Sequence, residues 1–255
     1  MRKMGIGLQL YTLRNELAED FRGGLRKVAA LGYEGVEFAG YGGLTAEELR
    51  ALLDELGLRA IGSHVRYPLL KERLQEELAY AKAIGAEYVV CPNLPPEERE
   101  DWGSVYAFLS EAGEEAKKYG LRLAYHNHAF EFESKVDGMW AYDALFERVA
   151  ADRLQVEMDV GWVQFAGEDP LAYIRKYAGR LPIVHLKDFR KAADGTIDTR
   201  ELGHGIVPLP DVLQAASDAG VAWLVVEQDQ CVNPPFDSIA TSVEWLKANY
   251  LPKVD

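Results

Sequence analysis

The stretch LPIVHLKD, residues 181–188, joins a short apolar run to two ionisable side chains, His185 and Lys187. Seven other stretches of the sequence resemble this one; each of the eight has the length of one β-strand, and most are apolar throughout rather than alternating. Continuously apolar strands are typical of a parallel sheet that is covered on both faces. The other seven stretches are residues 4–10, 35–40, 58–64, 87–92, 121–126, 154–159 and 222–229.

The segments between these strands carry the start and stop signals of helices. Thr45 and Glu48 form a capping box, and Gly57 ends the apolar stripe that follows. Eight alternating strand and helix signals in about 250 residues predict an α/β fold, a single (β/α)₈ TIM barrel over residues 1–255. An open doubly wound sheet is the alternative, but no linker-like break interrupts the alternation. Further signals predict helix ends at Gly32, Gly85 and Gly220, a helix from Pro95-Pro96 to about Tyr119, and a helix start at Asp169-Pro170.

Composition restricts the partners and the cellular setting. The formal net charge of −13 repels polyanions, so we expect neither nucleic acid nor an anionic membrane surface as a partner. The two cysteines, Cys91 and Cys231, have no zinc-site or redox-pair spacing. No stretch approaches the ~20 apolar residues of a membrane span. The N-terminal stretch lacks the apolar centre of a signal peptide. We therefore expect a soluble cytoplasmic protein, for which a homo-oligomer is possible.

Polar side chains stand at the carboxyl ends of the predicted strands, where a barrel of this kind builds its site. Residues two apart on a strand share a face, which pairs His185 with Lys187 and Glu227 with Asp229. Imidazole and carboxylate groups without thiolates suit one divalent cation, with manganese expected and magnesium, cobalt or zinc as alternatives. The predicted ligands are His126, Asp159, His185 and Glu227.

Several roles stay open at this stage, since a histidine taken alone is more often a hydrogen-bond partner of the backbone than a ligand. Glu131 is an alternative to His126 as the fourth ligand. Lys187 either contacts the substrate or neutralises Asp188. Glu157 points the same way as Asp159 one layer deeper, so it needs a buried partner, for which we expect an arginine or lysine.

The predicted mouth of the barrel has further candidates for substrate contact. We expect His64, at the end of its strand, and Arg14 to contact the substrate, and Trp162 to form an apolar wall. The connection over residues 189–209 is long enough to act as a lid, and His204 within it is expected to be a solvated turn residue.

The ordered set of strand ends resembles the xylose isomerase-like TIM barrel superfamily, of the sugar phosphate isomerase/epimerase type. The nearest likeness is to its keto-inositol dehydratases and ketose 3-epimerases. The residues that carry it are LQLYTLR (8–14), YHNHAFEF (125–132), MDVGW (158–162), HLKDF (185–189), ELGHG (201–205) and VEQD (226–229).

The resemblance implies a metal held by Glu, Asp, His and Glu at the carboxyl end of the barrel. The last three correspond to Asp159, His185 and Glu227, whereas His126 stands where the epimerases carry a glutamate. Those epimerases use two glutamates as acid and base, so here His128 or Glu131 is expected to take the missing role.

The expected activity is that of a metal-dependent isomerase or epimerase on a small carbohydrate, a sugar or keto-sugar. Glu227, or a histidine of the 126–128 pair, removes a proton next to a carbonyl to give an enediolate, and Lys187 or Arg14 holds the substrate. Dehydration of a keto-inositol or keto-sugar begins with the same step. No glycine-rich phosphate loop is present, which favours an unphosphorylated substrate. The alternatives of other classes are an endonuclease IV-like metal hydrolase and a non-catalytic sugar-binding barrel.

Overall fold

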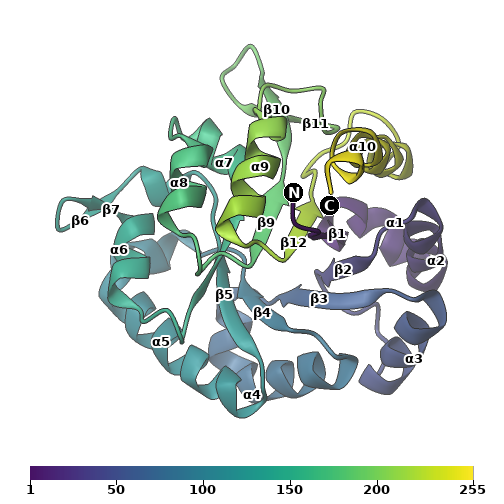
Figure 1. Ribbon diagram of the computed structural model, residues 1–255. Helices are drawn as coiled ribbons and strands as arrows, with labels where there is room; N and C mark the ends of the chain where they lie inside the picture. The colour runs from purple at the N-terminus through teal and green to yellow at the C-terminus, as the bar shows by residue number, and fades with distance from the viewer. Residues whose placement is uncertain (255) are drawn as a thin grey trace.

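Within residues 1–254, which the computed structural model describes, eight parallel strands form a closed ring (Figure 1). Around the ring, β1 is followed by β12, β9, β8, β5, β4, β3 and β2, which pairs again with β1. Each of the eight strands of this ring lies inside its predicted range, and the predicted (β/α)₈ barrel is confirmed. The strands are β1 (Gly5–Gln9), β2 (Gly35–Phe38), β3 (Arg59–His64), β4 (Tyr88–Cys91), β5 (Arg122–His126), β8 (Gln155–Asp159), β9 (Ile183–Leu186) and β12 (Trp223–Val226).

Helices surround the ring on its outside (Figure 1). None of them, within residues 1–254, is long and apolar enough to cross a membrane. They are α1 (Arg14–Glu19), α2 (Phe21–Leu31), α3 (Ala46–Leu56), α4 (Tyr67–Ile84), α5 (Trp102–Lys118), α6 (Ala141–Arg148), α7 (Val160–Phe165), α8 (Pro170–Lys176), α9 (Leu209–Ala219) and α10 (Pro235–Asn249). Short 3₁₀ turns cover η1 (Leu10–Leu13), η2 (Pro96–Glu100), η3 (Phe130–Phe132) and η4 (Leu251–Lys253). Two small hairpins pair β6 (Lys135–Val136) with β7 (Met139–Trp140), and β10 (Asp188–Lys191) with β11 (Ile197–Arg200).

Most of the predicted helix signals are confirmed. Both hydrogen bonds of the Thr45–Glu48 capping box are present, and Gly57 ends α3 in the left-handed conformation with φ 66°. The predicted start of the helix that was expected from Pro95-Pro96 to about Tyr119 is wrong. Pro95-Pro96 leads into the turn η2, and α5 begins at Trp102 because the Asp101 side chain accepts a hydrogen bond from the Ser104 backbone N–H.

Side chains that point into the ring form layers, and the layers decide where chemistry is possible. The deepest part is an apolar plug made of Ile61, Tyr88, Val90, Ala124, Ile183, Trp223 and Val225. On three of these strands the next residue of the same facing, toward the carboxyl end, is ionisable. These residues are His126, His185 and Glu227, all buried. The plug therefore closes the barrel beneath a polar layer.

The long connection after β9 is fixed to the barrel rather than free. Its first part is the β10–β11 hairpin, which projects from the ring in Figure 1. The carboxylate of Asp188 accepts four backbone hydrogen bonds of 2.8–3.0 Å, from Phe189, Gly203, Gly205 and Val207. The expectation of a long loop over residues 189–209 is thus corrected to a hairpin and a tied return segment. His204 is exposed on that segment, as expected.

Candidate metal centre

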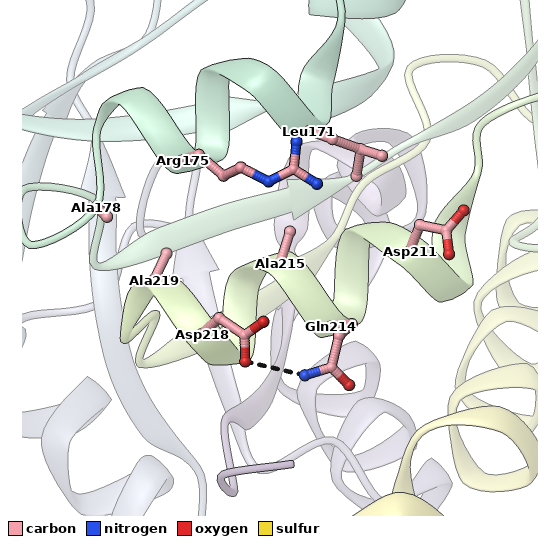
Figure 2. A pocket seen from close by; sticks show the side chains of 8 residues that line it. All are labelled: Leu171, Arg175, Ala178, Asp211, Gln214, Ala215, Asp218 and Ala219. Atoms are coloured by element: carbon pink, nitrogen blue, oxygen red, sulfur yellow. Dashed lines mark hydrogen bonds between the residues drawn. The ribbon is translucent and has the colours of Figure 1, made fainter.

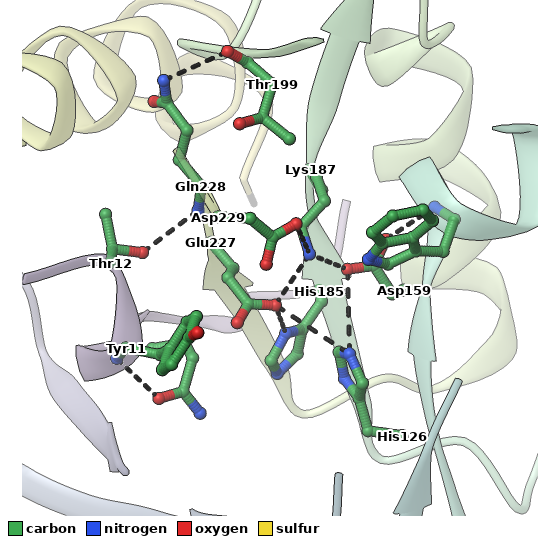
Figure 3. A network of polar contacts seen from close by, with 12 residues as sticks. Tyr11, Thr12, His126, Asp159, His185, Lys187, Thr199, Glu227, Gln228 and Asp229 are labelled. Carbon is green, nitrogen blue, oxygen red and sulfur yellow. Dashed lines mark hydrogen bonds and ion pairs between the residues drawn. The ribbon is translucent and has the colours of Figure 1, made fainter. Parts of the chain in front are cut away.

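Four ionisable side chains meet at the carboxyl ends of β5, β8, β9 and β12. Each offers one ligand atom, and these atoms lie within 4.8 Å of one another. His126 Nε2 lies 4.0 Å from Asp159 Oδ2 and 3.9 Å from Glu227 Oε2 (Figure 3). His185 Nδ1 lies 3.0 Å from the same Glu227 oxygen. The upper cluster, as we name it, consists of His126, Asp159, His185 and Glu227, all buried.

The upper cluster fits a divalent cation. Such an ion binds nitrogen and oxygen ligands at about 2.0–2.2 Å, so its ligand atoms lie within about 4.4 Å of one another. The spacing found here is close to that limit. The Asp159 Oδ2 atom is fully buried and forms an ion pair with Lys187 Nζ at 2.9 Å, and a carboxylate oxygen has a second lone pair that a cation can use. The donors are imidazoles and carboxylates, the set that manganese, magnesium, cobalt and zinc accept.

Asp159 is held in place by two neighbouring groups. Its Oδ1 atom accepts a hydrogen bond of 2.8 Å from the Trp162 backbone at the start of α7. Its own backbone pairs with the side chain of Asn127, whose Oδ1 accepts from Asp159 N at 3.0 Å and whose Nδ2 donates to Asp159 O at 3.2 Å. The backbone pairing between β5 and β8 ends at His126 and Glu157. The side-chain amide of Asn127 therefore extends the hydrogen bonding between the two strands beyond that pair. Asn127 was missed in the sequence, where only its place between two histidines marks it.

Lys187 lies buried against the upper cluster. Its Nζ atom is 2.9 Å from Asp159 Oδ2, 3.1 Å from Glu227 Oε2 and 2.8 Å from Asp229 Oδ2 (Figure 3). Burial lowers the pKa of Lys187, but the three carboxylates raise it well above its ordinary value, so the side chain is an ammonium. The alternative in which Lys187 neutralises Asp188 is wrong, because backbone N–H groups occupy both oxygens of Asp188.

Beneath the upper cluster lie two buried carboxylates, Glu37 and Glu157, which we name the carboxylate floor. Glu157 Oε1 lies 2.7 Å from His64 Nε2, 3.1 Å from His126 Nδ1 and 3.0 Å from His185 Nε2. Glu37 Oε2 lies 2.8 Å from His185 Nε2 and 3.1 Å from His64 Nε2. The expected arginine or lysine partner of Glu157 is therefore wrong, since three histidines take that place. Glu37 was missed in the sequence, although it is a glutamate inside an apolar strand, the same signal by which Glu157 was recognised.

His64 and the two glutamates of the carboxylate floor shift one another's pKa values. Burial raises the pKa of Glu37, but the positive charges of His64 and His185 outweigh it and bring the pKa well below its ordinary value. Burial and the nearby Glu37 raise the pKa of Glu157. Burial lowers the pKa of His64, yet the two glutamates raise it to about 10. His64, predicted to contact the substrate, thus also serves as the counter-ion of the floor.

A cavity of about 730 Å³ opens onto the upper cluster. His126 and Glu227 line it, so two members of the cluster face its interior. Of the predicted substrate-contacting residues, His64 and Arg14 line the cavity, together with the proposed catalytic residue His128. Trp162 is not among its lining residues. Its ring lies 5.3 Å from the His128 ring and 5.4 Å from the Lys187 Nζ atom, and so covers the cluster from the side of α7.

Glu131 lies outside the upper cluster. Its Oε1 accepts a hydrogen bond of 2.7 Å from the Tyr125 hydroxyl, and its Oε2 accepts one of 2.9 Å from the His128 backbone. Neighbouring residues on a strand face opposite sides, so Tyr125 points away from the barrel interior into which His126 points. The alternative of Glu131 as the fourth ligand is therefore corrected. Glu131 instead fixes the backbone of His128 from behind β5, and burial raises its pKa to about 7.

His128 differs from an ordinary histidine in its protonation. The pKa of an ordinary histidine side chain is near ~6.5. Burial, with the nearby Lys187 ammonium, lowers the pKa of His128 to about 3. The ring is consequently neutral at neutral pH and offers the cavity one hydrogen-bond donor and one acceptor.

A second cavity, of about 510 Å³, lies between α8 and α9 on the outside of the barrel (Figure 2). Its lining includes Arg175, Asp211 and Asp218, none of which belongs to the predicted site. The upper cluster and the larger cavity are therefore the candidate site.

Comparisons with known proteins agree with this architecture. The inosose dehydratase of Geobacillus kaustophilus (strain HTA426) is 24% identical over 264 residues, which cover 87% of this chain and 85% of the relative. The crystal structure of a sugar phosphate isomerase/epimerase from Parabacteroides distasonis ATCC 8503 has a TM-score of 0.81 at 24% identity, covering 98% of this chain and 96% of that one.

A structure of the IOLI protein with a bound zinc atom has a TM-score of 0.77 at 16% identity, covering 97% of this chain and 100% of that one. At these identities the two structural likenesses establish the fold. The family model described as xylose isomerase-like TIM barrel matches residues 25–249, and the chain therefore belongs to the xylose isomerase-like TIM barrel family.

Proposed function

We propose that this chain is a divalent-metal-dependent enzyme that removes a proton from the carbon next to a carbonyl group of a sugar, keto-sugar or keto-inositol. The observation that carries the proposal is the upper cluster, whose imidazole and carboxylate donors meet at the inner end of a 730 Å³ cavity. A cavity of this size accommodates a single small carbohydrate. The family and the similarity to an inosose dehydratase support this class of substrate.

His126, Asp159, His185 and Glu227 would hold the metal, for which we propose manganese, with magnesium, cobalt and zinc as alternatives. When bound, such an ion supplies Lewis-acid chemistry that stabilises negative charge on a carbonyl oxygen. Burial raises the pKa of Glu227, but Lys187 and His185 lower it well below its ordinary value, so the carboxylate is ionised. Glu227 lines the cavity and is our first candidate for the base that takes the proton.

The other cavity residues would orient the substrate. A neutral His128 can donate a hydrogen bond to a substrate hydroxyl and accept one from it. Lys187 holds Glu227 ionised from 3.1 Å away, and we assign it this supporting role in the chemistry. Arg14, at the start of α1, and His64, at the end of β3, line the cavity and would contact hydroxyl groups.

Isomerisation is the first candidate outcome, because a single base can return the proton to the neighbouring carbon. Epimerisation by two glutamates is less well supported, since His126 stands where the first glutamate would be. Dehydration of a keto-inositol is the second candidate. The similarity to an inosose dehydratase over 87% of this chain favours it. In that case the same first step is followed by loss of a β-hydroxyl group.

The proposal is tested by incubating the protein with keto-sugars and inosose in deuterium oxide with added Mn²⁺. Deuterium at a carbon beside the carbonyl identifies both the substrate and the first step, and mass spectrometry of the product separates isomerisation from loss of water. A matched Asp159→Asn variant should lose exchange together with metal binding. The proposal fails if no compound exchanges deuterium although the wild-type protein binds one metal ion per chain.

A further inference from the structure

We propose that Glu37 and Glu157 are positioning residues that fix which ring nitrogen each histidine ligand presents to the metal. His126 would bind through Nε2 and His185 through Nδ1. The inference rests on the proposed metal centre and adds to it a specific orientation of two imidazoles. The basis is the set of contacts between the carboxylate floor and these rings.

The first ring is that of His126. Its Nδ1 atom lies 3.1 Å from Glu157 Oε1, and because an ionised carboxylate only accepts hydrogen bonds, we infer that this nitrogen carries the proton. In a neutral imidazole the other nitrogen, Nε2, then has a free lone pair. That atom faces Asp159 and Glu227 at 4.0 and 3.9 Å and makes no closer polar contact with any residue from 1 to 254. Glu157 thus aims the lone pair of His126 into the upper cluster.

The ring of His185 is held the other way round. Its Nε2 atom lies 2.8 Å from Glu37 Oε2 and 3.0 Å from Glu157 Oε1, so this nitrogen carries the proton toward the floor. Its Nδ1 atom lies 3.0 Å from Glu227 Oε2 inside the upper cluster, which is a hydrogen-bond distance, and a bound cation would take the place of the proton between these two atoms. Carboxylates that accept the second N–H of a histidine ligand fix its tautomer and orientation, and their loss weakens metal binding about 10–100-fold.

His64 completes the floor without joining the upper cluster. Its Nε2 atom lies 2.7 Å from Glu157 and 3.1 Å from Glu37, and its ring stacks on that of His185 with centroids 5.5 Å apart. Two carboxylates this deeply buried repel each other unless a donor stands between them. His64 supplies that donor and keeps both acceptors aligned under the ligands.

The lower layer also has the composition of a metal site. His64, His126, Glu157 and His185 offer atoms within 4.8 Å of one another. However, three histidine nitrogens already lie 2.7–3.1 Å from the single oxygen Glu157 Oε1, which are the distances of hydrogen bonds. In the upper cluster, by contrast, His126 Nε2 lies 4.0 and 3.9 Å from the two carboxylates, which leaves room for an ion between them. The geometry therefore assigns the lower layer a supporting role and leaves one ion for each chain.

The first test is a nitrogen-15 NMR measurement on histidine-labelled wild-type protein with bound Zn²⁺. We expect metal-induced shifts at Nε2 of His126 and at Nδ1 of His185. Coordination of both rings through the same nitrogen overturns the inference, as does binding of two ions per chain. Failure of the wild-type protein to bind any ion would instead remove the proposed metal centre itself, so the two failures are distinguishable.

The second test measures metal affinity by competition with a chelator. Glu157→Gln touches both ligand histidines and should weaken Zn²⁺ binding about 10–100-fold. Glu37 contacts only one of the two ligand histidines, His185, so Glu37→Gln should have a smaller effect. Glu133→Gln, at an exposed position, is the matched control and should bind as the wild type does. Equal affinity in all four proteins overturns the inference. If a floor variant does not fold, the NMR assignment on the wild type still decides.

Discussion

Lys187 Nζ lies 2.9 Å from Asp159 Oδ2, so a buried ammonium and a proposed metal ligand meet at one carboxylate oxygen. The same ammonium is 3.1 Å from Glu227 and 2.8 Å from Asp229. A single positive charge therefore faces three carboxylates. Lys187 balances part of the negative charge of these carboxylates, and a divalent ion in the upper cluster would balance the rest.

Replacing Lys187 by methionine leaves two buried carboxylates, Asp159 and Glu227, and the partly exposed Asp229 without their cation. We expect the free energy of unfolding in the presence of EDTA to fall by about 3–5 kcal/mol, the effect of removing one partner of a buried ion pair. Added Mn²⁺ should then stabilise the variant more than the wild type. Urea unfolding with and without metal measures both effects. Lys191→Met, at an exposed position, is the control. Equal stabilisation of Lys187→Met and the wild type by Mn²⁺ would contradict this account.

Asn127→Asp keeps an acceptor for the Asp159 backbone N–H but removes the donor to the Asp159 carbonyl. We expect the free energy of unfolding to fall by about 1–3 kcal/mol. We also expect Mn²⁺ affinity to fall about tenfold, because Asp159 loses its fixed place. Calorimetric titration measures the affinity, with the exposed Asn15→Asp as control. Unchanged affinity would show that α7 alone positions Asp159.

Glu131 gives a stability that depends on pH. Burial raises its pKa from 4.5 to about 7, so the folded protein holds a proton that the unfolded chain releases earlier. Its contribution is present below about pH 4.5 and is lost as the pH rises through 7, with a maximum of about 3 kcal/mol. Glu131→Gln should therefore lose less stability than the wild type between pH 5 and pH 8. Parallel unfolding free energies in the two proteins over this range would falsify the prediction.

Gly161 allows α7 to approach the backbone of Lys187. A Cβ atom at this position would lie 2.7 Å from the Lys187 carbonyl oxygen and 2.9 Å from its Cβ atom. We expect Gly161→Ala to lower the free energy of unfolding by about 1–3 kcal/mol, the usual effect of overpacking, and to weaken metal binding. Gly103→Ala is the control, because its nearest neighbour is a side-chain oxygen at 3.3 Å. Equal stability of the two variants would contradict the clash.

Much of the fold follows from local sequence patterns. Runs such as YVVC and WLVV are apolar on both faces, as a parallel sheet that is covered on both sides requires, and this pattern can be recognised from the sequence alone. The four residues of the upper cluster were predictable for a related reason, since each stands at the end of such a run. Their convergence then follows from closing the ring, which brings neighbouring strand ends together.

The misses concern partners that lie far apart in the sequence. Glu37 and His185 are 148 residues apart, and nothing near either residue indicates that they share a hydrogen bond. The same holds for Glu157, whose three histidine partners come from three other strands. The start of α5 was missed for a local reason, because Asp101 caps the helix more effectively than the preceding proline pair, which forms a turn of its own.

The lining of the larger cavity is unevenly divided around the ring. Tyr11, Tyr41, Arg66 and Asn93 extend from the segments after β1 to β4, whereas the upper cluster belongs to β5, β8, β9 and β12. Under the proposed function, the first half of the chain would shape which substrate is admitted, and the second half would hold the groups that move protons. Changes in the loops of the first half would then alter selectivity without altering the reactive groups.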